Sequence, residues 1–241
     1  MPISKPYYRI MRSCGGAPLN YIYCKTYASD RYNLIHTFKI IENDLKKLFE
    51  YVEPAEKNEK VFSHRLYELF LRCATEFETN CKQILLANGY PVRSMDIRDY
   101  YKINAANQLS HYEVKLSIWH PGPKIIKPFE EWNSGHSLTW YQDYNDVKHD
   151  RSKKFELANL SNVLMASAGL LATLFAQFET EVFDAYSESY HSSSDADGFE
   201  YTSNNIFMVK PYRGWTEDES YSFSSGDIIE SVSSFQQYPF T

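Results

Sequence analysis

A short polar segment, residues 140–151, contains the side chains best suited to chemistry on a phosphodiester. It reads WYQDYNDVKHDR. In a helix, Asn145 and His149 would share one face with Lys148 and Arg151 alongside, because residues three or four positions apart are neighbours. A histidine moves protons near neutral pH, and lysine or arginine stabilises charge that develops on phosphate. We therefore take Asn145, Lys148, His149 and Arg151 as candidate catalytic residues.

A purely structural interpretation of this segment stays open. Asn145 and His149 would then cap a break before the last long helix, and the charged side chains would form a solvated face. The sequence has no glycine-rich phosphate loop, no HExxH or GxSxG motif and no cluster of metal ligands. These absences weigh against dehydrogenases, kinases, zinc proteases and serine hydrolases. We expect neither a cofactor nor a metal.

Glu76 is a further candidate, because it stands beside the apolar stripe of a predicted helix. It follows Cys73, a member of that stripe, by one turn. A carboxylate near an apolar face needs a partner, because burying an unpaired charge is costly. We predict an ion pair with Lys148, His149 or Arg151 of a neighbouring helix, and a structural role for this pair is favoured over a catalytic one.

The elements that position these residues are predicted to be helical. Apolar residues recur at three- and four-residue spacing in the longest segments. Ser63 and Asn88-Gly89 supply the start and stop signals of the clearest one. The long helices cover about residues 34–52, 62–88 and 155–183.

The last two of these helices should pack together and bury Phe77, Leu85, Leu160 and Leu174. The run ASAGLLA from Ala166 has small residues that permit close helix–helix approach, either in the core or at a subunit interface.

Shorter elements are expected between and after the long helices. Asp96 would cap a short helix, and Ser137 would cap a second one that carries the polar segment. Alternating apolar residues predict a strand before His120. These elements cover about residues 96–107, 137–147 and 112–118, and another short strand is expected at 205–210.

The C-terminal part of the chain differs in composition from the rest. From residue 186 onward, nine acidic residues accompany only two basic ones, whereas the whole chain has a net charge of −6. The stretch HSSSDADG from His191 is typical of a linker. We therefore divide the chain into an N-terminal arm (1–30), a helical bundle domain (31–185) and an acidic aromatic tail (186–241) that is loosely packed or depends on a partner.

The remaining composition indicates the cellular setting. The N-terminus lacks the apolar core of a signal peptide, and no stretch of about 18 apolar residues predicts a membrane span. The cysteines at 14, 24, 73 and 81 lack zinc-site spacing, and Cys73 and Cys81 should be buried reduced thiols. We expect a cytoplasmic protein.

Two sets of residues resemble a known family. One set is Ser63, Arg65, ATEFE from Ala74 and NGY from Asn88; the other is the polar segment continued by Phe155 and ANL from Ala158. Together they resemble an uncharacterised family of bacterial proteins related to the HEPN helical domains. The resemblance spans about residues 62–180 and implies a bundle of about five helices. Together with the strand patterns, the expected fold is mainly α, a HEPN-like helical bundle with a small irregular or β insertion and a C-terminal tail.

The resemblance also implies a function. Many HEPN proteins are metal-independent RNases in toxin–antitoxin or phage-defence systems, often as dimers, whereas others only bind RNA or a partner protein. His149 matches the family's histidine, but the positions where active members carry an arginine hold Asp143, Tyr144 and Asn145, and Arg151 follows instead.

In an enzyme, His149 would activate a ribose 2′-hydroxyl while Lys148 and Arg151 hold phosphate. RNA, an antitoxin or defence protein and a second copy of the chain are the implied partners. The alternative is a non-enzymatic helical interaction module.

Overall fold

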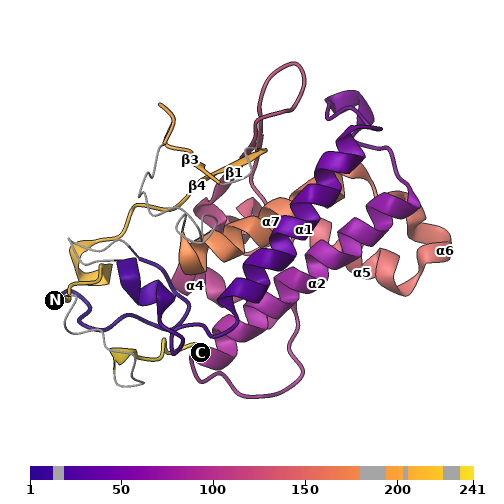
Figure 1. Cartoon of the computed structure of the whole chain (residues 1–241). Coiled ribbons are helices and arrows are strands. Elements are labelled where there is room, and N and C mark those ends of the chain that lie inside the picture. Colours follow the sequence, from indigo (N-terminus) through magenta and orange to yellow (C-terminus); the bar gives the residue numbers. More distant parts are fainter. Residues whose placement is uncertain (13–18, 180–193, 203–205, 225–233) are drawn as a thin grey trace.

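The longest helices form the centre of the protein. The structure, a computed structural model, describes residues 1–12, 19–179, 194–202, 206–224 and 234–241. Helices α1 (Arg31–Phe49), α2 (His64–Ala87) and α7 (Leu160–Phe178) lie side by side (Figure 1). The prediction of a mainly α protein is confirmed.

Helix α2 forms where its local signals place it. The Ser63 side chain accepts a hydrogen bond from the Leu66 amide at 3.2 Å, which supplies the predicted N-cap. At the other end Gly89 adopts φ +79°, the left-handed conformation that glycine accepts without strain. Caps at both ends and a buried apolar stripe between them explain why this helix could be predicted closely.

Helix α7 packs along α2 in the same direction. Cys73 Sγ lies 3.2 Å from Ser167 Oγ near the middle of the contact. The predicted core residues of the two helices are all fully buried, at 0% exposure: Phe77, Leu85, Leu160 and Leu174. Burial also raises the pKa of the Cys73 thiol to about 11, so Cys73 stays protonated, as expected of a packing residue.

The small-residue run of α7 lies in the core of one chain. Its members, residues 166–172, are all buried. A Cβ on Gly169 would lie only 3.2 Å from the Trp140 ring, so glycine here lets helix α5 (Thr139–His149) approach. The sequence left two alternatives for this run, the core or a subunit interface, and the structure places it in the core. A homodimer would therefore have to use another surface.

Helix α7 is also the one described helix long and apolar enough to span a membrane. However, 89% of its most apolar window is buried inside the protein. The helix is therefore covered mainly by other residues of the protein.

The connection from α5 to α7 differs from the prediction. The last helix begins at Leu160 rather than near Phe155, because Asn159 is the N-cap and accepts from the Asn162 amide at 3.0 Å. The intervening residues form a short α6 (Arg151–Lys154) and a 3-10 turn (Phe155–Leu157). The predicted end near Phe183 lies outside the described residues.

Ser137 does not cap α5, so the prediction of this N-cap is wrong. Leu138 is the N-cap residue, and the Glu131 carboxylate accepts from the Thr139 amide at 3.0 Å in place of a capping side chain. The short helical region after α2 does form, as α3 (Ile97–Tyr101) and α4 (Ile103–Asn107), and Asp96 caps α3 as predicted.

A small antiparallel sheet lies beside α7 and includes part of the C-terminal segment. Its strand order is β2-β1-β4-β3. Strands β1, β3 and β4 are labelled in Figure 1. Strand β4 pairs with β1 in the centre of the sheet, and Phe207 and Val209 of β4 are fully buried. The strands are β1 (Glu113–Leu116), β2 (Lys124–Ile126), β3 (Glu200–Tyr201) and β4 (Phe207–Lys210).

The described part of the C-terminal segment is therefore packed onto the body, not loosely attached. At its end, the Gln236 amide donates to the Pro6 carbonyl at 3.0 Å, and the Tyr238 amide donates to Asn88 Oδ1 at 2.8 Å. The first three residues of the predicted linker, 191–193, and Cys14 lie outside the described residues. The rest of that linker forms a turn in which Asp195 pairs with Lys115.

Candidate functional site

The polar segment forms most of α5 and the break after it. Trp140 and Tyr144 turn inward and are almost completely buried, whereas Lys148 and His149 at the end of the helix are exposed. Asp150 leaves helical geometry, and α6 then adds further exposed cations, Arg151, Lys153 and Lys154. This order places a basic turn at one end of the molecule (Figure 1).

Two of the candidate residues bond to their own helix. The Asn145 side-chain amide donates to the Tyr141 carbonyl at 3.1 Å, and Lys148 Nζ donates to Tyr144 Oη at 3.0 Å. Both bonds join residues four positions apart, as expected on a helix. The hydrogen bond to Tyr144 raises the pKa of Lys148, so its ammonium group remains charged at neutral pH.

His149 and Arg151 are directed away from the core. The Arg151 guanidinium lies 5.4 Å from the centre of the Tyr67 ring, a cation–π contact with α2. In the described part of the chain, the His149 ring makes no hydrogen bond, ion pair or ring contact. Arg151 is thus held by an aromatic ring, and His149 is available to solvent.

An aromatic cluster beside this turn was missed in the sequence. The Phe155 ring centre lies 5.5 Å from Phe62, 4.9 Å from His64 and 6.0 Å from Tyr67. Phe62 and His64 are exposed, and Tyr67 is half-buried. One signal for it was present, because Tyr67 lies off the apolar stripe of α2, where a soluble helix normally carries polar residues, and Phe62 stands just before the helix.

Backbone contacts hold the cluster together. Phe62 and Asn159 form an antiparallel bridge, and the Leu160 amide donates to the Val61 carbonyl at 3.0 Å. The starts of α2 and α7 are therefore fixed to one another just where α6 and Phe155 pass. We call the exposed surface made by His64, Tyr67, Lys148, His149 and Arg151 the α2–α6 surface.

Acidic residues partly balance the cations there. Lys154 pairs with Asp146 at 3.5 Å and Lys153 with Asp150 at 3.8 Å. The side chains of these pairs are 44–80% exposed. Such exposed pairs contribute only about 0–1 kcal/mol each, so an anionic ligand can displace their carboxylates at little cost.

Glu76 is not part of the site, which corrects the predicted ion pair. Its carboxylate makes no ion pair among the described residues, and Arg72 of the same helix acts on it only as a charge that partly offsets the rise in its pKa. Glu78 faces α5 instead. Its carboxylate accepts from Tyr141 Oη at 2.8 Å and lies 3.6 Å from Lys82 Nζ.

The unpaired, half-buried Glu76 should slightly destabilise the fold at neutral pH. Desolvation raises its pKa in the folded state, so the folded state binds a proton more readily than the unfolded state. Protonated Glu76 therefore favours the folded state at low pH. This contribution to the free energy of unfolding is lost as the pH rises through the pKa that Glu76 has in the folded state. We expect Glu76→Gln to raise the free energy of unfolding at pH 7 by up to about 0.5 kcal/mol.

Urea unfolding at neutral pH and near pH 4 would measure this effect, and the gain should shrink at the lower pH. Glu78→Gln, one half-turn away, is the matched control. It should lower stability by about 1 kcal/mol, because Tyr141 loses a charged acceptor. Destabilisation by Glu76→Gln would show that this carboxylate has a stabilising contact.

No cluster of metal-binding side chains occurs in residues 1–12, 19–179, 194–202, 206–224 and 234–241. Comparisons of the chain with protein-family models, with curated proteins and with solved structures give no match. The chemistry of the α2–α6 surface is therefore the basis for a functional interpretation.

Proposed function

We propose that the α2–α6 surface binds single-stranded RNA. The observation that supports this most is the contact of Arg151 with Tyr67, next to the exposed His64 and its half-buried neighbour Phe155. Single-stranded RNA is held by cations on its phosphates and by aromatic or guanidinium planes on which its unstacked bases lie. Lys148 and Arg151 supply the cations, and His64 and Tyr67 supply rings.

Binding without cleavage is the form of this function that we favour. Cleavage of the 2′-hydroxyl type needs a second group that acts together with His149. Asn145 is bonded to its own helix, and Glu76 lies on another face of α2. A HEPN-type site with two copies of His149 would need a dimer. The dimer and a defence or antitoxin partner remain proposals that rest on the family resemblance. A cytoplasmic location remains a proposal that rests on the sequence pattern of the N-terminus.

RNA affinity and its salt dependence test the proposal. For an RNA of about 12 nucleotides, fluorescence anisotropy would compare the wild type with the double variant Lys148→Ala/Arg151→Ala at about 50 and about 200 mM salt. We expect about tenfold weaker binding and a salt slope reduced by about 0.7 to 1.4, because one or two phosphate contacts to a single strand are lost. The wild-type protein should leave the RNA uncut when no metal is added.

A matched control removes the same charge elsewhere. Lys5 and Arg98 are exposed near the other end of α2, so Lys5→Ala/Arg98→Ala should change affinity less than about twofold. RNA cleavage that disappears in His149→Ala would support the enzymatic alternative. A wild-type protein that binds no RNA at low salt would leave only the interaction-module interpretation.

A further inference from the structure

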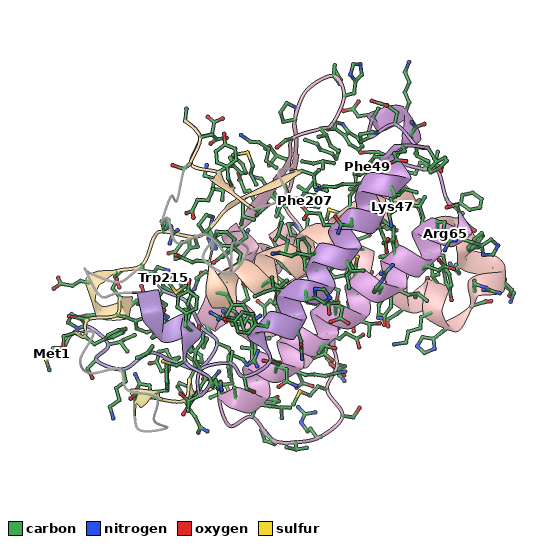
Figure 2. All side chains as sticks on the ribbon, in the orientation of Figure 1. Met1, Lys47, Phe49, Arg65, Phe207 and Trp215 are labelled. Atoms are coloured by element: carbon green, nitrogen blue, oxygen red, sulfur yellow. The ribbon has the colours of Figure 1, made fainter. Side chains whose placement is uncertain are left out.

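A groove lies between α1 and α2, next to the α2–α6 surface. Its volume is about 360 Å³, within the range of small-ligand sites. Leu48 and Leu69 contribute apolar floor, and three cations, Lys47, Arg65 and Arg72, line the sides. Figure 2 shows Lys47 on α1 and Arg65 on α2 at the same end of these neighbouring helices.

The groove carries one more positive charge than negative. Asp44 and Glu68 also line it, and they pair with its cations. Arg72 is held firmly by Asp44 at 2.8 Å, but the Lys47 and Arg65 side chains are 72% and 82% exposed. Exposed pairs contribute little, so Lys47 and Arg65 can exchange their carboxylates for the phosphate of a ligand.

Tyr51 gives this groove an exposed aromatic wall. It follows the end of α1, its side chain is 86% exposed, and its ring stacks on no other ring among the described residues. Burying a large ring is favourable, and an uncovered ring beside cations is the arrangement on which a nucleic-acid base stacks. The groove therefore combines a surface for a base with charges for a phosphate.

The groove and the α2–α6 surface share the first turns of α2. Arg65 faces the groove, whereas His64 and Tyr67 belong to the α2–α6 surface. Each residue of a helix is rotated by about 100° from the last, so these side chains diverge around one exposed helical turn. A strand on one surface can continue around this turn into the other.

We propose that the groove is a nucleotide subsite of the same RNA-binding surface. Tyr51 stacks on one base, and Lys47 and Arg65 hold the adjacent phosphates of a single strand that continues across the start of α2. This inference rests on the proposed RNA binding and extends its site to α1. It predicts a role for Lys47 and Tyr51, which the sequence did not single out.

Variants in the groove separate this inference from the proposed function. With the RNA of about 12 nucleotides, Tyr51→Ala and Lys47→Ala should each weaken binding about five- to tenfold, whereas Tyr51→Phe should bind like the wild type. Both altered side chains are exposed, so thermal unfolding should be unchanged. A 5-bromouridine RNA should cross-link to Tyr51, detected by mass spectrometry in the tryptic peptide 48–57.

Each outcome decides between the alternatives. Wild-type affinity in Lys47→Ala and Tyr51→Ala, with no cross-link at Tyr51, would overturn the groove subsite. If Lys148→Ala/Arg151→Ala still weakens binding in that case, the proposed function stands without it. Absence of RNA binding by the wild type would overturn both.

Discussion

Phe77→Ala should lower the free energy of unfolding by about 4 kcal/mol, because the ring packs among several aromatic rings in the core. The side chain is completely buried. Its ring centre lies 5.6 Å from Phe129, 5.3 Å from Trp140 and 6.1 Å from Tyr141. These partners come from α5 and the segment before it, so the substitution removes the packing that seats α5 on α2.

Urea denaturation followed by circular dichroism would measure this loss, and the near-ultraviolet aromatic signal should weaken as well. Tyr51→Ala is the control, because that residue is 86% exposed and removal of its ring should change stability by less than about 0.5 kcal/mol. A loss below about 1.5 kcal/mol for Phe77→Ala would contradict the central position of this ring.

Helix α2 shows why part of the fold can be predicted from sequence. Its apolar spacing, the Ser63 cap and the Asn88-Gly89 stop all act within a few residues, so each can be recognised without knowing the neighbours. The end of α7 near Phe155 was harder. There, Asn159 takes the N-cap position, so the helix begins at Leu160 and not near Phe155. This shift is larger than the one or two residues by which helix boundaries commonly differ.

Glu76 and Glu78 show the limit of the same reasoning. The apolar stripe indicates which face of α2 is buried, but it does not indicate which neighbouring helix covers each side. The two carboxylates differ by about 200° around the helix axis, and only Glu78 meets Tyr141 of α5. The predicted ion pair therefore named Glu76, whereas the carboxylate that contacts α5 is Glu78.

The C-terminal segment shows that composition alone can mislead. Its acidity suggested a separate tail, but several of its charges pair with residues of the body. Arg213 of this segment lies between Glu179 and Glu200, and Lys115 of β1 pairs with Asp195. The pairing of β4 with β1 joins segments far apart in the chain, and such long-range register depends on neighbours that a local pattern does not contain.

The N-terminal arm should prove to be an integral part of the fold for a similar reason. Arg9 is almost completely buried and forms an ion pair with Asp30, just before α1. Its Nη1 also donates to Gln177 Oε1 of α7 at 3.2 Å, and Gln177 Nε2 donates to Asn80 Oδ1 of α2 at 2.9 Å. This network joins the arm to all three long helices at the end of the bundle opposite the α2–α6 surface.

Arg9→Ala should lower the free energy of unfolding by about 3 kcal/mol, because it leaves Asp30 and the buried Gln177 side chain without their cation. Asp30 is 30% exposed, which keeps the loss near the lower end of the range for buried pairs. Arg9→Lys should lower the free energy of unfolding less than Arg9→Ala does. Lysine retains the charge, but it cannot contact Asp30 and Gln177 at the same time as the guanidinium group does. Arg65→Ala is the matched control, because it removes an arginine whose side chain is 82% exposed and should cost less than about 1 kcal/mol.

Chemical denaturation of these variants, together with hydrogen exchange at the α7 C-terminus, would distinguish global from local effects. If Arg9→Ala lowers the free energy of unfolding and the exchange protection of the α7 C-terminus by the same amount, the arm and the helices unfold as one cooperative unit. Equal, small effects of Arg9→Ala and Arg65→Ala would contradict the network. In that case the arm would be a detachable segment, and the bundle of α1, α2 and α7 would owe its stability to apolar packing alone.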